Sequence, residues 1–300
     1  MRILVTGANG QLGIEIEKEI ENSDNLYFFV GHDLLDITNE DEVNAFVSEK
    51  SIDVIINCAA YTKFDLSKKN YSDAYMINSI GPRILADAIK KNDGILIHIS
   101  SDYVFSGNDN KEYTPKDDTF PISVYGKSKS YGEKLIVDSK CNYIIFRTSW
   151  LYGGERKNFV YTIFNAINEK DEIQVVEDQF GTPTYVNDLS NFLISIIENN
   201  TKQELIEKTG IYHFANEGVT NWYNVAKTVY EYRKELDTDY KNNCNIIPIS
   251  TNEYPSNDNR PKYSPLCSKD LDTFGYKNRN WKIALKDCIL KYVNHKDIKI

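Results

Sequence analysis

The sequence is poor in cysteine and offers no arrangement that would cross-link the chain or bind zinc. Its cysteines are scattered, odd in number and free of any Cys-x-x-Cys spacing; they are Cys58, Cys141, Cys244, Cys267 and Cys288. We therefore predict neither a disulfide framework nor a zinc site, and no cluster of His, Asp and Glu suggests another metal. The start, Met1–Gly7, also lacks the long apolar segment of a secretory signal, so a cytoplasmic protein is expected.

Long apolar runs and an excess of basic residues are missing as well. The densest apolar stretches, Val54–Ile56 and Phe192–Ile197, are much shorter than the roughly 18 residues of a membrane-spanning helix, so no membrane association is predicted. Because 35 Lys and Arg face 44 Asp and Glu, the formal charge of −9 opposes phosphate contacts, and no nucleic-acid partner is expected. A phosphorylated small molecule stays open, since local backbone amides can hold a phosphate at any net charge.

Short β-branched runs alternate with amphipathic stretches from the start to about residue 150. The expected strands are Arg2–Thr6, Leu26–Val30, Asp53–Asn57, Gly94–Ser100 and Asn142–Arg147. The expected helices are Gln11–Glu21, Glu40–Glu49, Asp73–Lys91 and Val124–Asp138, with an N-cap at Thr38–Asn39 before the second. Repeated strand, helix, strand with short connections predicts an α/β fold with a doubly wound, Rossmann-like parallel sheet.

The spacing loosens after residue 150, where turn-rich pieces separate shorter strands and helices. We predict a dinucleotide-binding domain in residues 1–150 and a smaller α/β cap in residues 151–300 that mainly binds substrate. The stretches Asn187–Glu198 and Trp222–Leu236 are expected to be helices that return to the sheet or pack on it. The 300 residues suffice for this division, and no internal repeat interrupts it.

Three glycines mark the turn between the first expected strand and the first expected helix. Gly7, Gly10 and Gly13 are spaced Gly-x-x-Gly-x-x-Gly, one residue wider than the commoner dinucleotide fingerprint. Glycine at these points permits a tight turn, close approach of a diphosphate and packing of the helix on the sheet. The helix N-terminus adds free amides and a favourable dipole, so the loop predicts a bound dinucleotide.

The end of the second expected strand leaves the choice between NADPH and NADH open. An acidic residue there usually holds the ribose hydroxyls and repels a 2′-phosphate, yet Val30–Asp33 offers no clear counterpart. Its loss permits NADPH, and His32 could lie near a phosphate, but no arginine is adjacent to clamp one. A surface histidine in a loop explains His32 equally well.

A phenol and an ammonium stand four residues apart at Tyr125 and Lys129, one above the other on a helix face. A lysine beside a phenol favours the phenolate, so we expect the pKa of Tyr125 to be lowered toward neutrality. The spacing alone is unspecific, because three other tyrosines, Tyr230 among them, also have a lysine four residues on. Only Tyr125 also follows a hydroxyl, that of Ser101, at the end of a predicted parallel strand, where ligands bind. Ser101, Tyr125 and Lys129 are therefore the predicted catalytic set.

Seven stretches carry a resemblance that spans almost the whole chain. They are Gly7–Gly13, Leu35–Thr38, Asn57–Thr62, Ser101–Phe105, Arg147–Gly153, Asp178–Thr184 and Arg260–Ser264. Together they resemble the extended short-chain dehydrogenase/reductase family, most closely its branch that reduces nucleotide-linked 4-keto-6-deoxysugars. Several matched segments in the same order are far more specific than any one motif.

The resemblance implies NADPH or NADH as the cofactor and roles for some of the residues. Tyr125 would be the general acid, Lys129 would bind the nicotinamide ribose and tune Tyr125, and Ser101 would stand where the family usually has threonine. The implied cofactor contacts, besides Tyr125 and Lys129, are Gly7, Gly10, Gln11, Leu12, Gly13, Asp36, Ile37, Ala59, Ala60 and Tyr61. The implied contacts to a nucleotide-sugar substrate are Ser101, Asp102, Trp150 and Arg260.

The reaction implied by the resemblance is hydride transfer to the C4 ketone of such a sugar, with dTDP-4-dehydro-L-rhamnose giving dTDP-L-rhamnose for polysaccharide biosynthesis. The substrate-side segment Tyr61–Leu66 departs from the family pattern, so a reductase for a different nucleotide-sugar is one alternative. A 4,6-dehydratase or epimerase is disfavoured because Tyr103 stands where a dehydratase has a glutamate. A non-catalytic, dinucleotide-binding regulatory subunit is the alternative from another class, although Tyr125 and Lys129 are retained. A homodimer is a candidate assembly.

Overall fold

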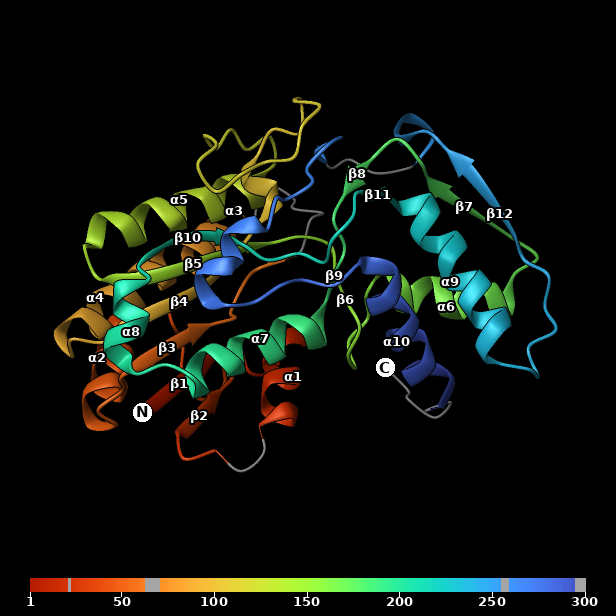
Figure 1. Cartoon of the computed structure of the whole chain (residues 1–300). Coiled ribbons are helices and arrows are strands. Elements are labelled where there is room, and N and C mark those ends of the chain that lie inside the picture. Colours follow the sequence, from red (N-terminus) through yellow and green to blue (C-terminus); the bar gives the residue numbers. More distant parts are fainter. Residues whose placement is uncertain (21–22, 63–70, 255–258, 295–300) are drawn as a thin grey trace.

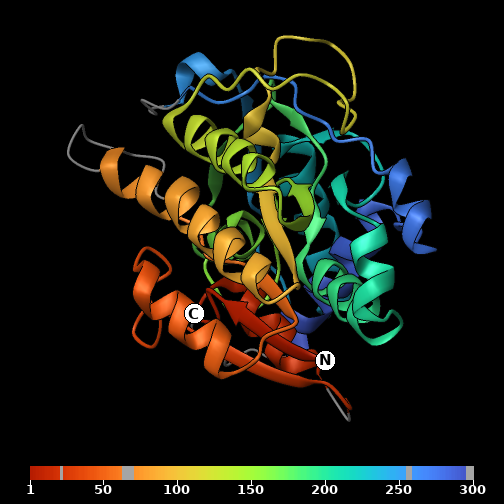
Figure 2. The ribbon, with the colours of Figure 1, turned by 90° about the vertical axis from the view of Figure 1, so that its left-hand side faces the viewer.

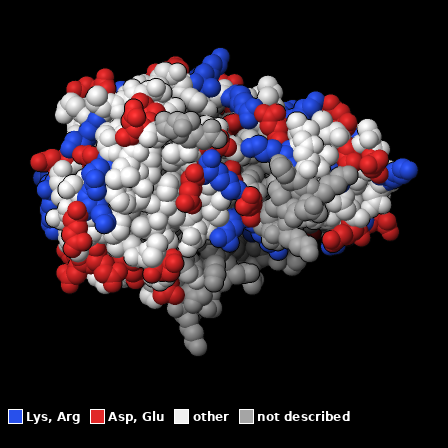
Figure 3. All heavy atoms as spheres, turned by 90° about the horizontal axis from the view of Figure 1, so that it is seen from below, with Lys and Arg blue, Asp and Glu red and all other residues white. Residues whose placement is uncertain are grey.

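The computed structural model describes residues 1–20, 23–62, 71–254 and 259–294, which form a larger and a smaller lobe (Figure 1). The larger lobe is built on a six-stranded sheet, and the smaller one on helices and a two-stranded sheet. Among the described helices, none combines the length and the apolar character needed to cross a membrane. Seen from below, acidic and basic side chains are interspersed in small groups over the surface (Figure 3).

The six strands of the large sheet are all parallel and lie in the order β2-β1-β3-β4-β5-β10. Their bounds are β1 Arg2–Thr6, β2 Leu26–Val30, β3 Val54–Asn57, β4 Ile95–Ser101, β5 Asn142–Thr148 and β10 Gly210–His213. Successive side chains face opposite layers, so Ile3 and Val5 pack on one side and Leu4 on the other. The strand order runs outward in both directions from β1 and β3, which confirms the predicted doubly wound, Rossmann-like fold.

Helices cover both faces of this sheet. α2 (Glu40–Glu49), α4 (Gly81–Lys91) and α5 (Val124–Ser139) pack side by side on one face, which Figure 2 shows in orange and yellow-green. α1 (Gln11–Glu19), α7 (Val186–Glu198) and α8 (Lys202–Glu207) pack on the other face. Residues beyond 150 therefore complete the core of the larger lobe, through α7, α8 and β10.

Capping residues fix the starts of two of these helices. The side chain of Asn39 accepts a hydrogen bond from Glu42 N at 3.3 Å, which confirms the predicted N-cap of α2. The Ser123 hydroxyl accepts one from Gly126 N at 3.0 Å and caps α5. Tyr125 consequently lies in the first turn of α5, next to the carboxyl end of β4.

The predicted helix Asp73–Lys91 is not a single α-helix. α3 (Tyr71–Tyr75) passes into a π-helical turn, Met76–Ile80, before α4 begins. The Asn78 amide donates to the Ser128 hydroxyl at 3.0 Å, and the Ser79 hydroxyl donates to the Ser128 carbonyl at 2.7 Å. These contacts with α5 hold the wider turn, which local sequence preferences do not specify.

The smaller lobe has a hydrophobic core of its own. Its main elements are α6 (Phe159–Glu169), β7 (Glu172–Val176), α9 (Trp222–Leu236), β12 (Asn245–Ile249) and α10 (Trp281–Asn294). α9 packs against α6, α10 and the β7–β12 pair, so the prediction that Trp222–Leu236 returns to the large sheet is wrong. Its apolar face, which includes Val225 and Val229, is buried in this second core instead.

Short strands join the two lobes near the carboxyl ends of the large sheet (Figure 1). β6 (Leu151–Tyr152) pairs with β9 (Thr184–Tyr185), and β8 (Phe180–Gly181) pairs with β11 (Thr220–Asn221). Open parallel sheets bind ligands at this edge, where the strand order changes direction. The fold therefore places the join between the lobes at the expected position of a ligand.

A buried ion pair ties β5 to α5 next to this edge. The Arg147 guanidinium donates to both oxygens of Glu133, through Nε at 3.0 Å and Nη2 at 2.7 Å, and the Ser100 hydroxyl donates to the same carboxylate. The side chains of Arg147 and Glu133 are only 3% and 5% exposed. Two buried charges are thus compensated by direct hydrogen bonds, and removing one would leave the other unpaired.

We predict that Arg147→Met lowers the free energy of unfolding by about 3–5 kcal/mol, because Glu133 is left as an uncompensated buried charge. Urea unfolding followed by circular dichroism measures the change. The matched control is Lys286→Met, which removes the exposed pair between Lys286 and Glu235 and should leave the midpoint nearly unchanged. Equal effects of the two substitutions would contradict the prediction.

Candidate active site

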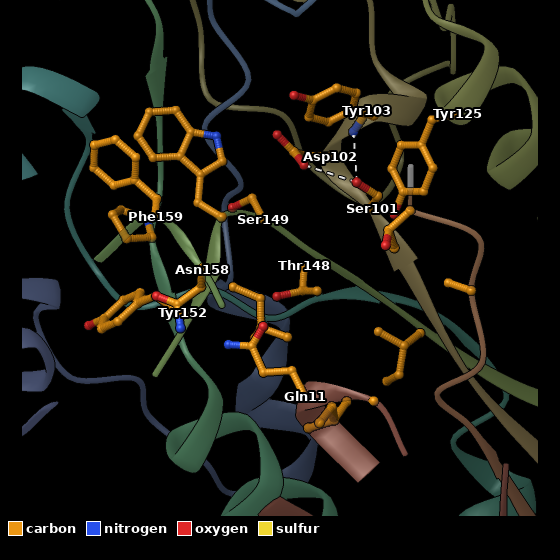
Figure 4. Close-up of a pocket in the computed structure, with 18 of the residues that line it drawn as sticks. Gln11, Ser101, Asp102, Tyr103, Tyr125, Thr148, Ser149, Tyr152, Asn158 and Phe159 are labelled. Carbon is orange, nitrogen blue, oxygen red and sulfur yellow. Dashed lines mark hydrogen bonds between the residues drawn. The ribbon is translucent and has the colours of Figure 1, made fainter. Parts of the chain in front are cut away.

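A cavity of about 440 Å³ lies between the carboxyl ends of the large sheet and the smaller lobe (Figure 4). Its wall combines the loop after β1, the ends of β4 and β5, the first turn of α5 and residues of the smaller lobe. The predicted site residues that line it are Gly10, Gln11, Leu12, Ala60, Ser101, Asp102, Tyr125, Lys129, Trp150 and Arg260. The fold thus brings most of the predicted catalytic, cofactor and substrate residues to one place.

The glycine loop after β1 forms one wall of the cavity. Gly7 has a φ of +68°, and a Cβ there would lie 2.5 Å from Ala59 N, so only glycine fits. A Cβ on Gly13 would lie 2.6 Å from the Cα of Ala8. At Gly10 an added Cβ would meet only the Gly7 carbonyl oxygen, at 3.1 Å, and Gly10 lines the cavity. Since Gly10 is also the N-cap of α1 and brings no side chain onto the helix amides, this helix N-terminus can receive an anionic group.

Ser101 and Asp102 stand where β4 turns into a short 3-10 helix, Asp102–Val104. Ser101 Oγ accepts a hydrogen bond from Tyr103 N at 3.2 Å and donates one to Asp102 Oδ1 at 3.1 Å, both drawn in Figure 4. Asp102 Oδ2 accepts another from the Ser264 hydroxyl at 2.6 Å. Burial raises the pKa of Asp102 to about 7, although these hydrogen bonds oppose the rise. Asp102 therefore keeps a proton at pH values where a free aspartate is charged.

The ring of Tyr125 lies beside Ser101 (Figure 4) and stands edge-on to Tyr103, with ring centroids 5.6 Å apart. Burial raises the pKa of Tyr125 to about 12; a hydrogen bond with Ser101 lowers it, and the charge of Asp102 adds to the rise. The predicted lowering of this pKa toward neutrality is therefore wrong for this structure. Tyr125 holds its proton at neutral pH, as a proton donor must.

The side chain of Lys129 is 1% exposed and is directed at strand β4. Its Nζ donates to the Ile99 carbonyl at 2.6 Å and lies 3.4 Å from His98 Nε2. Burial lowers the pKa of Lys129 to about 8, and Glu133 and Cys58 offset part of that change. The Lys129 ammonium is held at the Ile99 carbonyl and is not among the groups that shift the pKa of Tyr125, so it does not produce the phenolate that the four-residue spacing predicts.

Two stacked tryptophans form the wall of the cavity toward the smaller lobe. The rings of Trp150 and Trp222 lie with centroids 3.6 Å apart and planes 11° from parallel, and Phe159 packs on Trp222 at 4.6 Å. Trp150 follows β5 with a φ of +49°, and a Cβ at Gly181 would lie 2.5 Å from its indole. The stack offers a broad aromatic surface to a ligand in the cavity.

A second cavity of about 610 Å³ adjoins the first in the smaller lobe. It lies along α6 and β7, and its lining includes Ile163, Gln174 and Gln179 together with the charged Lys170 and Glu172. Phe159, Trp222 and Arg260 line both cavities. The two spaces together suit an elongated ligand with chemically different ends.

The predicted cofactor segment Ala59–Tyr61 has one residue, Ala60, in the cavity wall. Ala59 contributes through its backbone, which approaches Gly7, and the Tyr61 backbone exchanges two hydrogen bonds with the Asn78 side chain, at 2.8 and 3.0 Å. The departure from the family pattern at Lys63–Leu66 lies outside the described residues.

Two of the implied cofactor contacts, Asp36 and Ile37, lie after β2 and do not line either cavity. Ile37 is 6% exposed and belongs to the core under α4. Burial raises the pKa of Asp36, but two hydrogen bonds from Thr38 and the charge of His32 together outweigh it, so the pKa is lowered. The side chain of His32 is 85% exposed. Within the described ranges, no group of three or more His, Cys, Asp or Glu could hold a metal ion.

Several wall residues were not predicted from the sequence, among them Asn158, Phe159 and Trp222. All three stand at the starts of helices in the smaller lobe, far along the chain from the glycine loop. Asn158 is the N-cap of α6, a local signal for a helix start that carries no information about a ligand. Their presence at the cavity depends on how the lobes pack.

Comparison with known proteins agrees with this geometry. Residues 1–294 match the family model described as RmlD substrate binding domain. The dTDP-4-dehydrorhamnose reductase of Aggregatibacter actinomycetemcomitans is 37% identical over 95% of this chain and 97% of its own length. A crystal structure of a dTDP-4-dehydrorhamnose reductase from Clostridium acetobutylicum has a TM-score of 0.88 and 38% identity, covering 96% of this chain and 98% of that one. The Bacillus anthracis enzyme of the same name, in complex with NADP, has a TM-score of 0.86 and 36% identity over 97% and 99%.

We predict that Asp102 makes the protein less stable as the pH rises. Since its pKa is raised from 3.8 to about 7 in the folded state, its contribution is fully present below about pH 4 and is lost as the pH passes 7. Relative to Asp102→Asn, whose amide does not titrate, the wild type should lose a few kcal/mol of unfolding free energy between pH 4 and 8. Urea unfolding of both proteins at several pH values tests this, and parallel curves would disprove it.

Proposed function

Because the chain belongs to the RmlD substrate-binding-domain family, we propose that it is an NAD(P)H-dependent oxidoreductase that reduces the C4 ketone of dTDP-4-dehydro-L-rhamnose to give dTDP-L-rhamnose. The observation that carries the proposal is the meeting of Ser101, Tyr125 and Lys129 with the glycine loop in a single cavity. Proteins named dTDP-4-dehydrorhamnose reductase align with nearly the whole of this chain, which supports the same substrate for it.

The glycine loop is suited to the cofactor. Gly10 is the N-cap of α1 and brings no side chain over the N-terminal amides, and it lines the cavity, so the diphosphate of a dinucleotide can approach this helix end. Gly10, Gln11 and Leu12 would hold the diphosphate, and Ala60 the adenosine side. The NADP complex of the Bacillus anthracis relative supports NADPH, with NADH as the other candidate. The bound dinucleotide supplies the hydride.

The protein's part in the reaction is to position the ketone and protonate it. Tyr125 carries its proton at neutral pH and gives it to the ketone oxygen as negative charge develops there. The Ser101 hydroxyl, beside Tyr125, holds that oxygen, and such preplaced donors commonly lower a barrier by a few kcal/mol. Lys129 would bind the nicotinamide ribose from its place one helical turn after Tyr125.

The two adjoining cavities suit the two ends of a nucleotide-sugar. The sugar would lie by Asp102 and Trp150 in the first cavity, and the nucleoside in the second, between α6 and β7. Arg260 lines both, which suits a guanidinium that contacts the linking diphosphate. We accordingly assign dinucleotide binding mainly to residues 1–150 and substrate binding mainly to residues 151–300, in a cytoplasmic enzyme whose assembly as a homodimer stays a prediction.

We predict that Tyr125→Phe reduces turnover by about two orders of magnitude or more, because the acid is lost, while dinucleotide binding stays near normal. Steady-state kinetics and a fluorescence titration with NADPH measure the two effects. Tyr230→Phe is the matched control, since Tyr230 also has a lysine, Lys234, four residues on but lies outside both cavities. Full activity of Tyr125→Phe would refute the assignment.

A substrate panel separates the proposed reaction from its neighbours. We expect one equivalent of NADPH or NADH to be oxidised for each equivalent of dTDP-4-dehydro-L-rhamnose, as followed by the loss of reduced-nicotinamide absorbance. A dehydratase or epimerase would recycle its nicotinamide, so product without net oxidation contradicts the proposal. A protein that binds NADPH but reduces none of several nucleotide 4-keto sugars would be a regulatory subunit instead.

A further inference from the structure

A chain of buried polar side chains crosses three strands and ends at Lys129. Thr6, Asn57 and His98 are each 0% exposed, and the sheet register pairs Thr6 with Asn57 and Asn57 with His98. Thr6 and Asn57 are the last residues of β1 and β3, and His98 is the middle residue of β4. The family resemblance gave no role to Thr6, Asn57 or His98.

The orientation of the Asn57 amide is fixed by its partners. Asn57 Oδ1 accepts from the Thr6 hydroxyl at 2.8 Å and from Ala59 N at 3.1 Å. A backbone N–H can only donate, so the oxygen must face Ala59 and the Nδ2 group must face His98. Asn57 Nδ2 lies 3.0 Å from His98 Nδ1, which therefore accepts.

This contact also fixes the tautomer of His98. Burial and the nearby Lys129 lower the pKa of His98 well below its usual value, so the ring is neutral and carries one proton. Since Nδ1 is the acceptor, the proton is on Nε2. His98 Nε2 lies 3.4 Å from Lys129 Nζ, so an N–H group is directed at the lysine nitrogen.

An N–H group at this place favours the uncharged form of Lys129. An ammonium has no lone pair with which to accept from Nε2–H, whereas a free amine has one. The Ile99 carbonyl takes one Nζ proton at 2.6 Å in either form. Other groups act on the same nitrogen: Glu133 on α5 and Cys58 after β3 favour the charge, and burial opposes it.

We propose that His98, held in one tautomer by Asn57, is a positioning residue that presents Nε2–H to Lys129 and gives Lys129 access to its free-amine form in the working pH range. The kinetic consequence rests on the proposed function: if the charged lysine supports catalysis, the His98 contact sets the alkaline limit of activity.

The tautomer is read directly on the wild-type protein without substrate. Long-range ¹H–¹⁵N spectra distinguish the two imidazole nitrogens, and the chain has only four histidines. We expect His98 Nε2 to carry the proton and Nδ1 to show the shift of an acceptor nitrogen. A proton on Nδ1 would overturn the proposal, whatever the variants do.

Two substitutions replace the Nε2–H donor that faces Lys129 Nζ with an acceptor. In Asn57→Asp the carboxylate accepts from Nδ1–H, which moves the lone pair of His98 to Nε2 and offers it to the ammonium. In His98→Gln the amide can turn its oxygen toward Nζ without adding charge. We expect the Lys129 titration midpoint, followed on ¹³C-labelled lysine, to rise on the order of one pH unit in each.

His213→Gln is the control, because His213 is also 0% exposed but its Nδ1 contacts the Tyr113 carbonyl instead of Lys129. It should leave the Lys129 midpoint in place. If Asn57→Asp does not fold, His98→Gln decides, and an unchanged midpoint there overturns the proposal.

Activity is measured in parallel as the pH profile of kcat/KM. The alkaline limb should move upward with the lysine midpoint in the same variants, a shift that mere loss of stability would not produce. If the wild type reduces no keto-sugar while the lysine titrations behave as expected, the proposed function fails and the inference about His98 stands. If the enzyme is active and the Lys129 midpoint is unchanged in His98→Gln, the proposed function stands and the inference about His98 fails.

Discussion

The close approach of Gly7 to Ala59 is the constraint on which the rest of the site depends. A single added carbon at Gly7 would lie 2.5 Å from the Ala59 nitrogen, so the loop after β1 can lie against the end of β3 only with glycine there. That approach positions Gly10 and the start of α1 at the cavity. It also places Ala59 N on the side chain of Asn57, so one backbone contact serves both the cofactor loop and the polar chain that leads to Lys129.

Burial acts on three titratable groups of the cavity in the same sense. It raises the pKa values of Tyr125 and Asp102 and lowers that of Lys129, and each shift favours the neutral form. Asp102 and Tyr125 therefore hold their protons more firmly than the same side chains in water. An anionic nucleotide-sugar and an anionic dinucleotide would meet these donors, the amide dipoles of α1 and the guanidinium of Arg260, which lines both cavities.

The local signals in the sequence predicted five of the six strands of the large sheet, because these strands follow from short-range chemistry, but they did not predict β10. Asn39 caps α2, and β-branched runs give strands whose ends differ from the prediction by at most one residue. The π-helical turn could not be predicted from local sequence, because Asn78 and Ser79 form hydrogen bonds with Ser128 on α5, about 50 residues away. The prediction placed α9 on the large sheet because an apolar helix face indicates that the helix is buried but not against which core it packs.

The same division applies to the site. The sequence distinguished Tyr125 from Tyr230 because only Tyr125 follows a hydroxyl at a strand end, that of Ser101. In the fold, Tyr125 lies beside Ser101 (Figure 4). The pKa of Tyr125 and the identity of Trp222 as a wall residue depend on burial and on lobe packing, which spacing along the chain does not contain.

The stacked indoles of Trp150 and Trp222 have an optical consequence. Two such chromophores at 3.6 Å and 11° couple their electronic transitions. Trp150 follows β5 of the larger lobe, whereas Trp222 begins α9 of the smaller lobe. Because both rings line the cavity, a ligand that shifts either one changes the coupling and with it the near-ultraviolet circular dichroism. The molecule thus carries a spectroscopic reporter of the aromatic wall of its cavity.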